Sequence, residues 1–298
     1  MNEFKKYQHI ERLGSDEVEG INLGDTFIFP KLDGSNASVW TSSGGRLQAG
    51  SRNRQLSLEN DNQGFNAYIQ EQQGIKDFFH DYADIRLYGE WLVPHTLKTY
   101  RDDVWHRFYV FDVWHHTLNK YIDYGIYRYV LEEYHINCIP AIAQITNPTL
   151  PDLMKCLENN TYLIKDGEGV GEGIVIKNYN FKNKYGRTTW AKIVRNEFKE
   201  QNRKANDVSK VVREVPEADM VESLLTEEMI RKTLAKITAE KEGWSSEYIK
   251  ELLGRVYHDF VVEESWNIVK KYKKPRVDFG TLNHFVIQKT KEVLKEVF

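Results

Sequence analysis

The feature that most constrains the fold of this chain is a change in the spacing of its apolar residues near residue 205. Before that point, short apolar or alternating runs are typical of strands, whereas the later apolar residues recur every three or four positions, as on one face of a helix. Hydrophobic residues make up 41% of the 298 residues, which is enough for a sizeable core. We therefore predict a strand-rich domain over residues 1–204 and a helical domain over residues 205–298.

The strand-rich domain also contains predicted helices. The runs that indicate strands are residues 26–30, 36–40, 46–51, 85–92, 107–114, 173–179 and 188–194, with a hairpin turn at Ser42–Gly45. Helical spacing predicts one helix over residues 65–79, another over 127–134 and a third over 150–157. After residue 205, apolar stripes cover residues 221–237, 249–260 and 282–294. The predicted class is therefore α+β, with a mixed or antiparallel sheet and a small all-helical C-terminal domain.

Charge and cysteine content limit the classes of protein that fit this chain. A net charge of -3 excludes a globally basic nucleic-acid binder but allows a local basic groove. Cys138 and Cys156 form no CxxC motif, which favours a reducing compartment. The sequence has no apolar run long enough to span a membrane, and its start lacks the apolar stretch of a signal peptide. We expect a soluble monomer in the cytoplasm of a bacterial or phage-infected cell.

A lysine at a strand end is the first candidate for chemistry. In PKLDGSN, residues 30–36, Lys31 lies between a predicted strand and an Asp-Gly turn, where it faces the cleft that the sheet encloses. An unperturbed lysine pKa of about 10.4 leaves roughly one molecule in a thousand deprotonated at neutral pH. A nearby cation or clustered lysines would lower that pKa and make the amine a nucleophile. Taken alone, the KxDG string is weak evidence, because such turns are common on surfaces.

Further short strings follow in order, each on or beside a predicted strand. They are SRNR (51–54), YGEW (88–91), FYVFD (108–112), EGIVIK (172–177) and WAKIV (190–194). The ordered set resembles the nucleotidyltransferase motifs of polynucleotide ligases and mRNA capping enzymes, and it is most similar to the bacteriophage RNA ligase 2 type. The resemblance covers roughly residues 25–200. It implies an ATP-grasp-like ligase domain and an ATP-dependent RNA ligase that repairs RNA.

The resemblance also implies a mechanism and its cofactors. Lys31 would take AMP from ATP, pass it to a 5′-phosphate, and a 3′-hydroxyl would then displace it to seal the strand. The cofactors would be ATP, as AMP bound covalently to Lys31, and Mg²⁺ or Mn²⁺ held by Glu172 and Glu90. The partners would be RNA ends or a nicked duplex. The residues assigned to the bound nucleotide are Lys31, Asp33, Gly34, Asn36, Arg52, Glu90, Phe111, Glu172, Lys177 and Lys192.

Individual roles follow from the same resemblance. Phe111 would stack on adenine, with Phe108 as the alternative, while Lys177 and Lys192 would contact the α-phosphate. The family often has a second lysine two positions after the equivalent of Lys192, where this chain has Val194, and the adjacent Arg195 is a candidate replacement. Four of the assigned residues also have a purely structural interpretation. The interpretations are a turn residue for Asn36, a solvated arginine for Arg52, a structural ion pair for Glu90 and a core aromatic for Phe111.

Other functions remain open at this point. An ATP-dependent DNA ligase, a GTP-dependent capping enzyme and an RNA-binding module without catalysis all fit parts of the pattern. DNA ligases and capping enzymes commonly carry an OB-fold after the last motif, which would need several alternating strands. The helical stripes here favour an RNA ligase instead. A basic strip with interleaved aromatics, residues 177–203, would suit a phosphate backbone or be an ordinary solvated edge.

Overall fold

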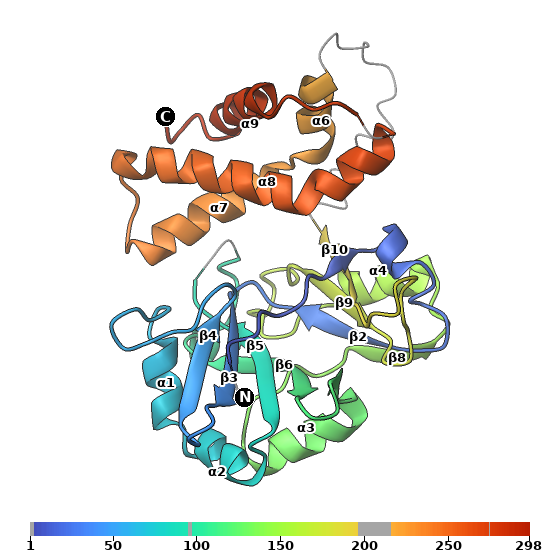
Figure 1. The fold of residues 1–298 in the computed structure, drawn as a ribbon, viewed down its shortest axis with the longest axis vertical. Coiled ribbons are helices and arrows are strands. Elements are labelled where there is room, and N and C mark those ends of the chain that lie inside the picture. The colour runs from blue at the N-terminus through green and yellow to red at the C-terminus, as the bar shows by residue number, and fades with distance from the viewer. Residues whose placement is uncertain (1–2, 95–96, 196–215, 274) are drawn as a thin grey trace. The chain divides into compact units, whose positions relative to one another are not determined.

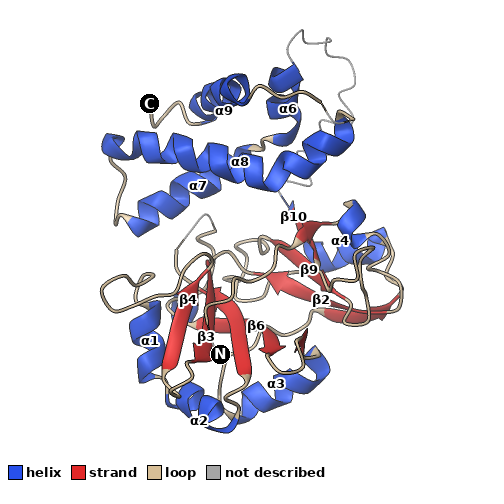
Figure 2. Ribbon diagram, in the orientation of Figure 1, coloured by secondary structure: helices blue, strands red, loops and turns tan. Residues whose placement is uncertain are grey.

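The computed structural model describes residues 3–94, 97–195, 216–273 and 275–298. The chain forms two compact units, Met1–Val194 and Arg195–Phe298 (Figure 1). The domain boundary predicted at residues 204 and 205 lies outside the described residues. The first unit contains all the described strands, whereas helices joined by loops make up the described part of the second unit (Figure 2).

The strands of the first unit form two five-stranded sheets. The β2 sheet has the order β1 (Glu11–Arg12), β10 (Ala191–Val194), β9 (Gly173–Lys177), β2 (Asp25–Lys31) and β8 (Ala143–Thr146). The β3 sheet has the order β4 (Leu47–Ser51), β3 (Ser35–Thr41), β5 (Ile85–Trp91), β6 (Phe108–His115) and β7 (Lys120–Tyr121). All neighbouring strands are antiparallel except β1 and β10. The predicted α+β class is confirmed.

Helices cover the first unit at the positions that the sequence indicates, with one difference. They are α1 (Phe65–Glu71), α2 (Gln73–Asp81), α3 (Tyr124–Glu133) and α4 (Leu150–Glu158). The single helix predicted over residues 65–79 is wrong, because Gln72 adopts an extended conformation between α1 and α2. The break accompanies a tight contact in which a Cβ on Gly74 would lie 2.0 Å from the carbonyl oxygen of Tyr134. Only glycine fits there.

The main core of the first unit joins the two sheets. Phe29 of β2 and Val175 of β9 belong to the same buried cluster as Leu87 of β5 and the helix residues Phe65 and Tyr127. Residues opposite one another on adjacent strands share a face. Lys31 is two residues after Phe29 on β2, so the two side chains lie on the same face of the strand. Lys31 therefore lies on the face of the β2 sheet that turns toward the rest of this core.

The second unit consists of α6 (Pro216–Leu224), α7 (Glu227–Glu240), α8 (Ile249–Lys271) and α9 (Phe279–Val293). Its buried cluster contains members of every predicted stripe, including Val221, Ile237, Phe260 and Val286. The first stripe is divided between two helices because Thr226 caps α7 by accepting a hydrogen bond from the amide of Met229 at 3.2 Å. No strand occurs in the described part of this unit. No described helix is long and apolar enough to cross a membrane.

Candidate active site

Lys31 is the last residue of β2, and its amine contacts a carboxylate from a neighbouring strand. Its Cα pairs with Gly173 of β9, and its Nζ lies 2.6 Å from Oε2 of Glu172. The Lys31 side chain is 20% exposed and that of Glu172 is 7% exposed, so solvent reaches the pair mainly from the lysine side. Gly173 lets the strands approach, since a Cβ there would lie 2.3 Å from the Ile193 carbonyl oxygen. The structure thus brings together the expected nucleophile and an expected metal ligand.

The turn after Lys31 is fixed by side chains from distant parts of the chain. The amide of Gly34 donates to Oε1 of Glu90 at 2.8 Å, and the amide of Asp33 donates to the hydroxyl oxygen of Tyr100 at 2.9 Å. A Cβ on Gly34 would lie 2.6 Å from a backbone oxygen of β5, so glycine is required. Glu90 therefore lies beside the Lys31 turn, where it accepts a hydrogen bond from the backbone.

Asp33 is buried and ties the same turn to a loop. The residue is only 1% exposed, and its Oδ2 accepts a hydrogen bond from the amide of Leu97 at 2.8 Å. A buried carboxylate with backbone partners stabilises local structure. The sequence indicated Asp33 but held no signal for Tyr100, because nothing in the motif strings includes the loop after β5.

Asn36 lies next to Glu90 across two strands. Asn36 is on β3 and its Cα partner on β5 is Glu90, so the two side chains lie on the same face of the β3 sheet. Asn36 is half-buried, which leaves its amide partly accessible beside the Lys31 turn. Arg52, in the turn after β4, is also half-buried, and no hydrogen bond or ion pair joins its side chain to the described residues.

A β-bulge separates the two candidate adenine-stacking residues. Tyr88 pairs with Asp112 whereas Gly89 pairs with Val110, so Phe111 is the extra residue of β6. A bulge re-aims the side chain it carries. Phe111 is half-buried. Phe108, by contrast, is 1% exposed and packs on Phe65 of α1 with ring centroids 5.1 Å apart. The alternative Phe108 is therefore a core residue.

Asp112 is the centre of a buried polar network. Its Oδ1 lies 2.8 Å from Nζ of Lys177, and its Oδ2 accepts from Trp190 Nε1 at 3.0 Å and from the Tyr7 hydroxyl. Lys177 also donates to the carbonyl oxygen of Phe111 at 2.6 Å. Burial lowers the pKa of Lys177 below its ordinary value, while the Asp112 carboxylate acts in the opposite direction.

This network surrounds Lys177, whose contact with the α-phosphate stays a prediction. The β2–β9 register pairs Lys31 with Gly173 but pairs Lys177 with Phe27, so Lys177 lies four residues away along β9. At the rise of a strand this is about 13 Å. Lys177 is also only 1% exposed. Its charge is matched inside the protein rather than beside Lys31, and it is no part of a basic surface strip. Residues 196–203 of that strip lie outside the described residues.

Lys192 lies on the same face of the β2 sheet as Lys31. Its Cα partner on β9 is Val175, and the Cα partner of Lys31 is Gly173. Val175 and Gly173 are two residues apart on β9, so they lie on the same face. Lys192 is half-buried. Val194, where the family often has a second lysine, is buried. Arg195, its candidate replacement, is the first residue of the second unit, and its role stays a prediction.

The carboxylates around Lys31 are compatible with a divalent cation. Among the described residues, no group of three or more His, Cys, Asp or Glu side chains is placed to hold a metal. Mg²⁺ commonly needs only one or two carboxylates, because waters and substrate phosphates complete its coordination. Glu172 and Glu90 flank the Lys31 turn from the two sheets and meet this requirement.

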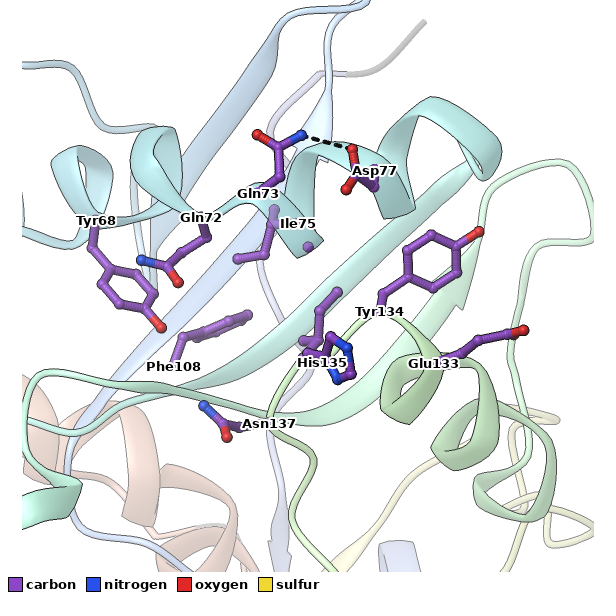
Figure 3. Close-up of a pocket in the computed structure, with 12 residues that line it drawn as sticks. Tyr68, Gln72, Gln73, Ile75, Asp77, Phe108, Glu133, Tyr134, His135 and Asn137 are labelled. Carbon is purple, nitrogen blue, oxygen red and sulfur yellow. Dashed lines mark hydrogen bonds between the residues drawn. The ribbon is translucent and has the colours of Figure 1, made fainter.

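A separate cavity of about 520 Å³ lies away from these residues. Its lining includes Tyr68 of α1, Gln72 between α1 and α2, Phe108 at the start of β6, and His135 and Asn137 after α3 (Figure 3). Phe108 packs against Phe65 of α1 on one face of the β3 sheet. Tyr109, its neighbour on β6, faces the other side of that sheet, and its Cα partner there is Glu90. Apart from Phe108, the alternative for adenine stacking, the predicted site residues are absent from this lining. The cavity is therefore distinct from the candidate active site.

Comparisons with known proteins bear on the family and the fold of the chain. The model of the RNA ligase family matches residues 25–194, which is more than half of the chain. Naegleria gruberi RNA ligase with PPi superimposes with a TM-score of 0.52 at 18% identity, over 67% of this chain and 58% of that chain. A mutant of that ligase with AMP and Mn gives a TM-score of 0.52 at 16% identity, over 66% and 57%.

These structural matches establish the fold, and they span somewhat more than half of the Naegleria protein's own length. A search of curated proteins found no significant match. The family match begins at residue 25 and ends at residue 194, so it takes in every motif from the Lys31 turn to β10. The chain belongs to the RNA ligase family.

Proposed function

We propose that this protein is an ATP-dependent RNA ligase of the bacteriophage RNA ligase 2 type, which repairs RNA by joining 3′-hydroxyl and 5′-phosphate ends. The observation that carries the proposal is the contact of 2.6 Å between Lys31 Nζ and Glu172, beside a turn whose Gly34 amide is held by Glu90. A surface lysine would not require carboxylates from two sheets to meet at its turn. The helical second unit supports the RNA ligase 2 type over enzymes with an OB-fold.

In the first step, Lys31 receives AMP from ATP. Its Nζ gives up a proton and attacks the α-phosphorus of ATP, so that an N–P bond forms while the bond between the α- and β-phosphates breaks. Pyrophosphate leaves with the electron pair of that bond. Glu172 orients the amine through the contact seen here. Lys192, on the same face of the sheet, offsets charge that develops on the α-phosphate.

Glu172 and Glu90 would hold Mg²⁺ or Mn²⁺ together with the phosphates of ATP. A bound divalent cation supplies charge neutralisation at the reacting phosphate and disfavours the ammonium form of the lysine. Asn36, beside Glu90, orients the phosphates through its amide.

The nucleoside is held by residues of the β3 sheet. Phe111 stacks on the adenine, and the Asp112–Lys177 pair fixes the strand position of Phe111 through the hydrogen bond from Lys177 to its carbonyl oxygen. Lys177 is thus a positioning residue in this proposal. Arg52, whose fork of donors is not engaged by the described residues, binds ribose or phosphate.

The later steps use RNA. An oxygen of a 5′-phosphate attacks the phosphorus of lysyl-AMP, the N–P bond breaks, and the RNA end is capped by AMP through a new phosphoanhydride. A 3′-hydroxyl then attacks the 5′-phosphorus, loses its proton, and AMP leaves as the phosphodiester forms. The substrates in this proposal are RNA ends or a nicked duplex.

Label transfer tests this proposal. The protein is mixed with Mg²⁺ and ATP or GTP labelled at the α-phosphate, and the covalent label is followed on a denaturing gel. We expect labelling by ATP, none in Lys31→Ala, and normal labelling in Lys76→Ala, which removes an exposed lysine of α2. Addition of RNA with a 5′-phosphate and a 3′-hydroxyl should discharge the label and yield joined strands.

Other outcomes would redirect the proposal. Labelling by GTP alone would indicate capping chemistry, and discharge by nicked DNA but not by RNA would indicate a DNA ligase. Retained labelling in Lys31→Ala would show that Lys31 is not the nucleophile. RNA binding without labelling by either nucleotide, after a pyrophosphate chase to remove AMP already bound, would indicate a binding module without catalysis.

A further inference from the structure

We infer that Tyr100 is a positioning residue that holds the turn carrying Lys31 and thereby sets the rate at which Lys31 reacts. The reaction in question rests on the function proposed above, whereas the contact itself does not. Tyr100 lies outside all the motif strings, in the loop between β5 and β6.

The hydroxyl of Tyr100 occupies the point where the Lys31 turn meets that loop. It accepts the amide hydrogen of Asp33 at 2.9 Å, and the next amide along, that of Gly34, donates to Glu90 at 2.8 Å. Two successive backbone donors directly after Leu32 are therefore held by side chains. With both amides fixed, the direction in which Lys31 leaves the strand is fixed as well.

Tyr100 is anchored on its own side of the contact. It is fully buried, its backbone forms an antiparallel bridge with Ile164, and its ring lies edge-on to Trp105 with centroids 5.3 Å apart. The amide of Leu97, three residues earlier, donates to Oδ2 of Asp33 at 2.8 Å. Two hydrogen bonds thus cross between the loop and Asp33 in opposite directions.

The environment of the hydroxyl keeps it neutral. Burial raises the pKa of Tyr100 well above its ordinary value, and the carboxylates of Glu172, Asp33 and Glu90 raise it further, although the hydrogen bond from the Asp33 amide acts in the opposite direction. Glu172 contacts Lys31 itself, whereas Asp33 belongs to the turn that follows Lys31 and Glu90 contacts that turn. A neutral hydroxyl placed among them accepts from Asp33 without adding charge to the site.

Tyr100→Phe removes this contact while keeping the ring. The Asp33 amide, buried under the loop, then lacks its acceptor, and the turn relaxes. A displacement of about 1 Å at a reacting group can lower a rate by on the order of 100-fold. We therefore expect lysyl-AMP formation at saturating ATP to slow by about 10- to 100-fold, with the ATP concentration at half-maximal rate changed by less than about threefold.

The matched control is Tyr109→Phe. Tyr109 is 4% exposed, and its hydroxyl donates to the carbonyl oxygen of Val104 at 3.2 Å. That bond holds the same loop but does not reach the Lys31 turn. Both variants lose one buried tyrosine hydroxyl, so a similar drop in thermal stability with an unequal drop in rate would separate positioning from general loosening.

Two readouts do not depend on ligase activity. One is hydrogen exchange at the Asp33 amide, and the other is the rate at which a lysine-selective acylating reagent modifies Lys31, read by mass spectrometry. In Tyr100→Phe we expect faster exchange at Asp33 and an altered acylation rate at Lys31, with both unchanged in Tyr109→Phe. These readouts stay decisive even if the wild-type protein takes no label from ATP, which would overturn the proposed function alone.

The inference is overturned if Tyr100→Phe matches Tyr109→Phe in Asp33 exchange and in Lys31 acylation. It is also overturned if exchange rises but the labelling rate of an active wild type is preserved in the variant, because the turn would then move without consequence for the reaction. A fall in rate explained wholly by weaker ATP binding would assign Tyr100 to nucleotide binding and likewise contradict the inference.

Discussion

Replacement of Asp112 by asparagine should destabilise the first unit severely. Asp112 is fully buried, and its carboxylate accepts hydrogen bonds from Trp190 and Tyr7 besides pairing with Lys177 at 2.8 Å. The substitution Asp112→Asn keeps the size of the side chain but removes the charge that offsets the lysine. The ammonium of Lys177, 1% exposed, would then be buried without its counter-charge.

The expected magnitude follows from the loss of one partner of a buried pair. Such a loss costs about 3–5 kcal/mol in free energy of unfolding. The lower end applies here, because burial already lowers the pKa of Lys177, and the variant can give up that proton instead of burying the charge. For a unit of this size, about 3 kcal/mol corresponds to a fall in Tm of about 6–12 °C.

The pH dependence has a definite sign. In Asp112→Asn the pKa of folded Lys177 lies further below its unfolded value of 10.5, so the unfolded chain binds more protons between the two values. The free energy of unfolding of the variant therefore rises with pH through that window, up to the unfolded pKa. Relative to wild type, the defect should shrink as the solution is made alkaline.

Urea unfolding of four proteins measures these effects. They are wild type, Asp112→Asn, Lys177→Met and the double variant, followed by tryptophan fluorescence and circular dichroism. The double variant removes the uncompensated ammonium, so we expect a coupling energy of about 1–3 kcal/mol between the two sites. Asp102→Asn is the control. Asp102 pairs with Lys165 at 2.8 Å, but the Asp102 side chain is 87% exposed and the Lys165 side chain is 40% exposed. This pair should therefore contribute less than about 1 kcal/mol to the free energy of unfolding.

Two results would refute this reasoning. One is an Asp112→Asn variant within about 1 kcal/mol of wild type at neutral pH, which would mean that Lys177 finds another partner or stays solvated. The other is a double variant that is less stable than Asp112→Asn, because removal of the buried ammonium would then have no benefit.

Further predictions concern the site and alkaline stability. Glu172→Gln should lower the rate of lysyl-AMP formation by at least about 100-fold with little change in Tm, measured by label transfer and thermal unfolding. Gly34→Ala puts a Cβ 2.6 Å from a backbone oxygen and should lower the free energy of unfolding by about 1–3 kcal/mol. Gly254→Ala, on α8, puts a Cβ where no atom lies within 4 Å, so it should not destabilise the protein. Urea unfolding measures both variants. Burial raises the pKa of Tyr88 and Tyr109 to about 12. The stabilisation that these neutral hydroxyls give the folded protein below pH 10 should therefore be lost as the pH rises through 12. Tyrosinate absorbance that appears together with unfolding would show this loss.

The sequence predicts best the parts of the site that are local. A strand followed by Asp-Gly is enough to place Lys31 at a strand end. The short strings fall on strands β2, β3, β5, β6, β9 and β10 of the structure, except SRNR, which begins at the last residue of β4 and continues into the turn. The partners of Asp33 could not be predicted, because Leu97 and Tyr100 are 64 and 67 residues away and belong to a loop without a motif. Hydrogen bonds over such separations depend on the packing of the whole unit.

Lys177 illustrates a different limit. Its place in EGIVIK suggests a phosphate contact, and the strand period does put it on the same face as Lys31. The sequence contains no register between β2 and β9, however, so it could not indicate that Lys177 lies opposite Phe27 rather than near Lys31. Nor could it indicate that Asp112, on a strand of the other sheet, would pair with it.

The Lys31 turn is where the two sheets are joined by the chain itself. Lys31 ends β2 in one sheet, and Ser35 begins β3 in the other, so the turn between them has a fixed position relative to both. Glu172 reaches Lys31 from the β2 sheet, and Glu90 reaches Gly34 from the β3 sheet. A small shift of one sheet against the other would therefore separate the two carboxylates that we propose share a cation. The core that packs Phe29 and Val175 against Leu87 resists that shift, so the apolar contacts between the sheets also maintain the geometry of the site.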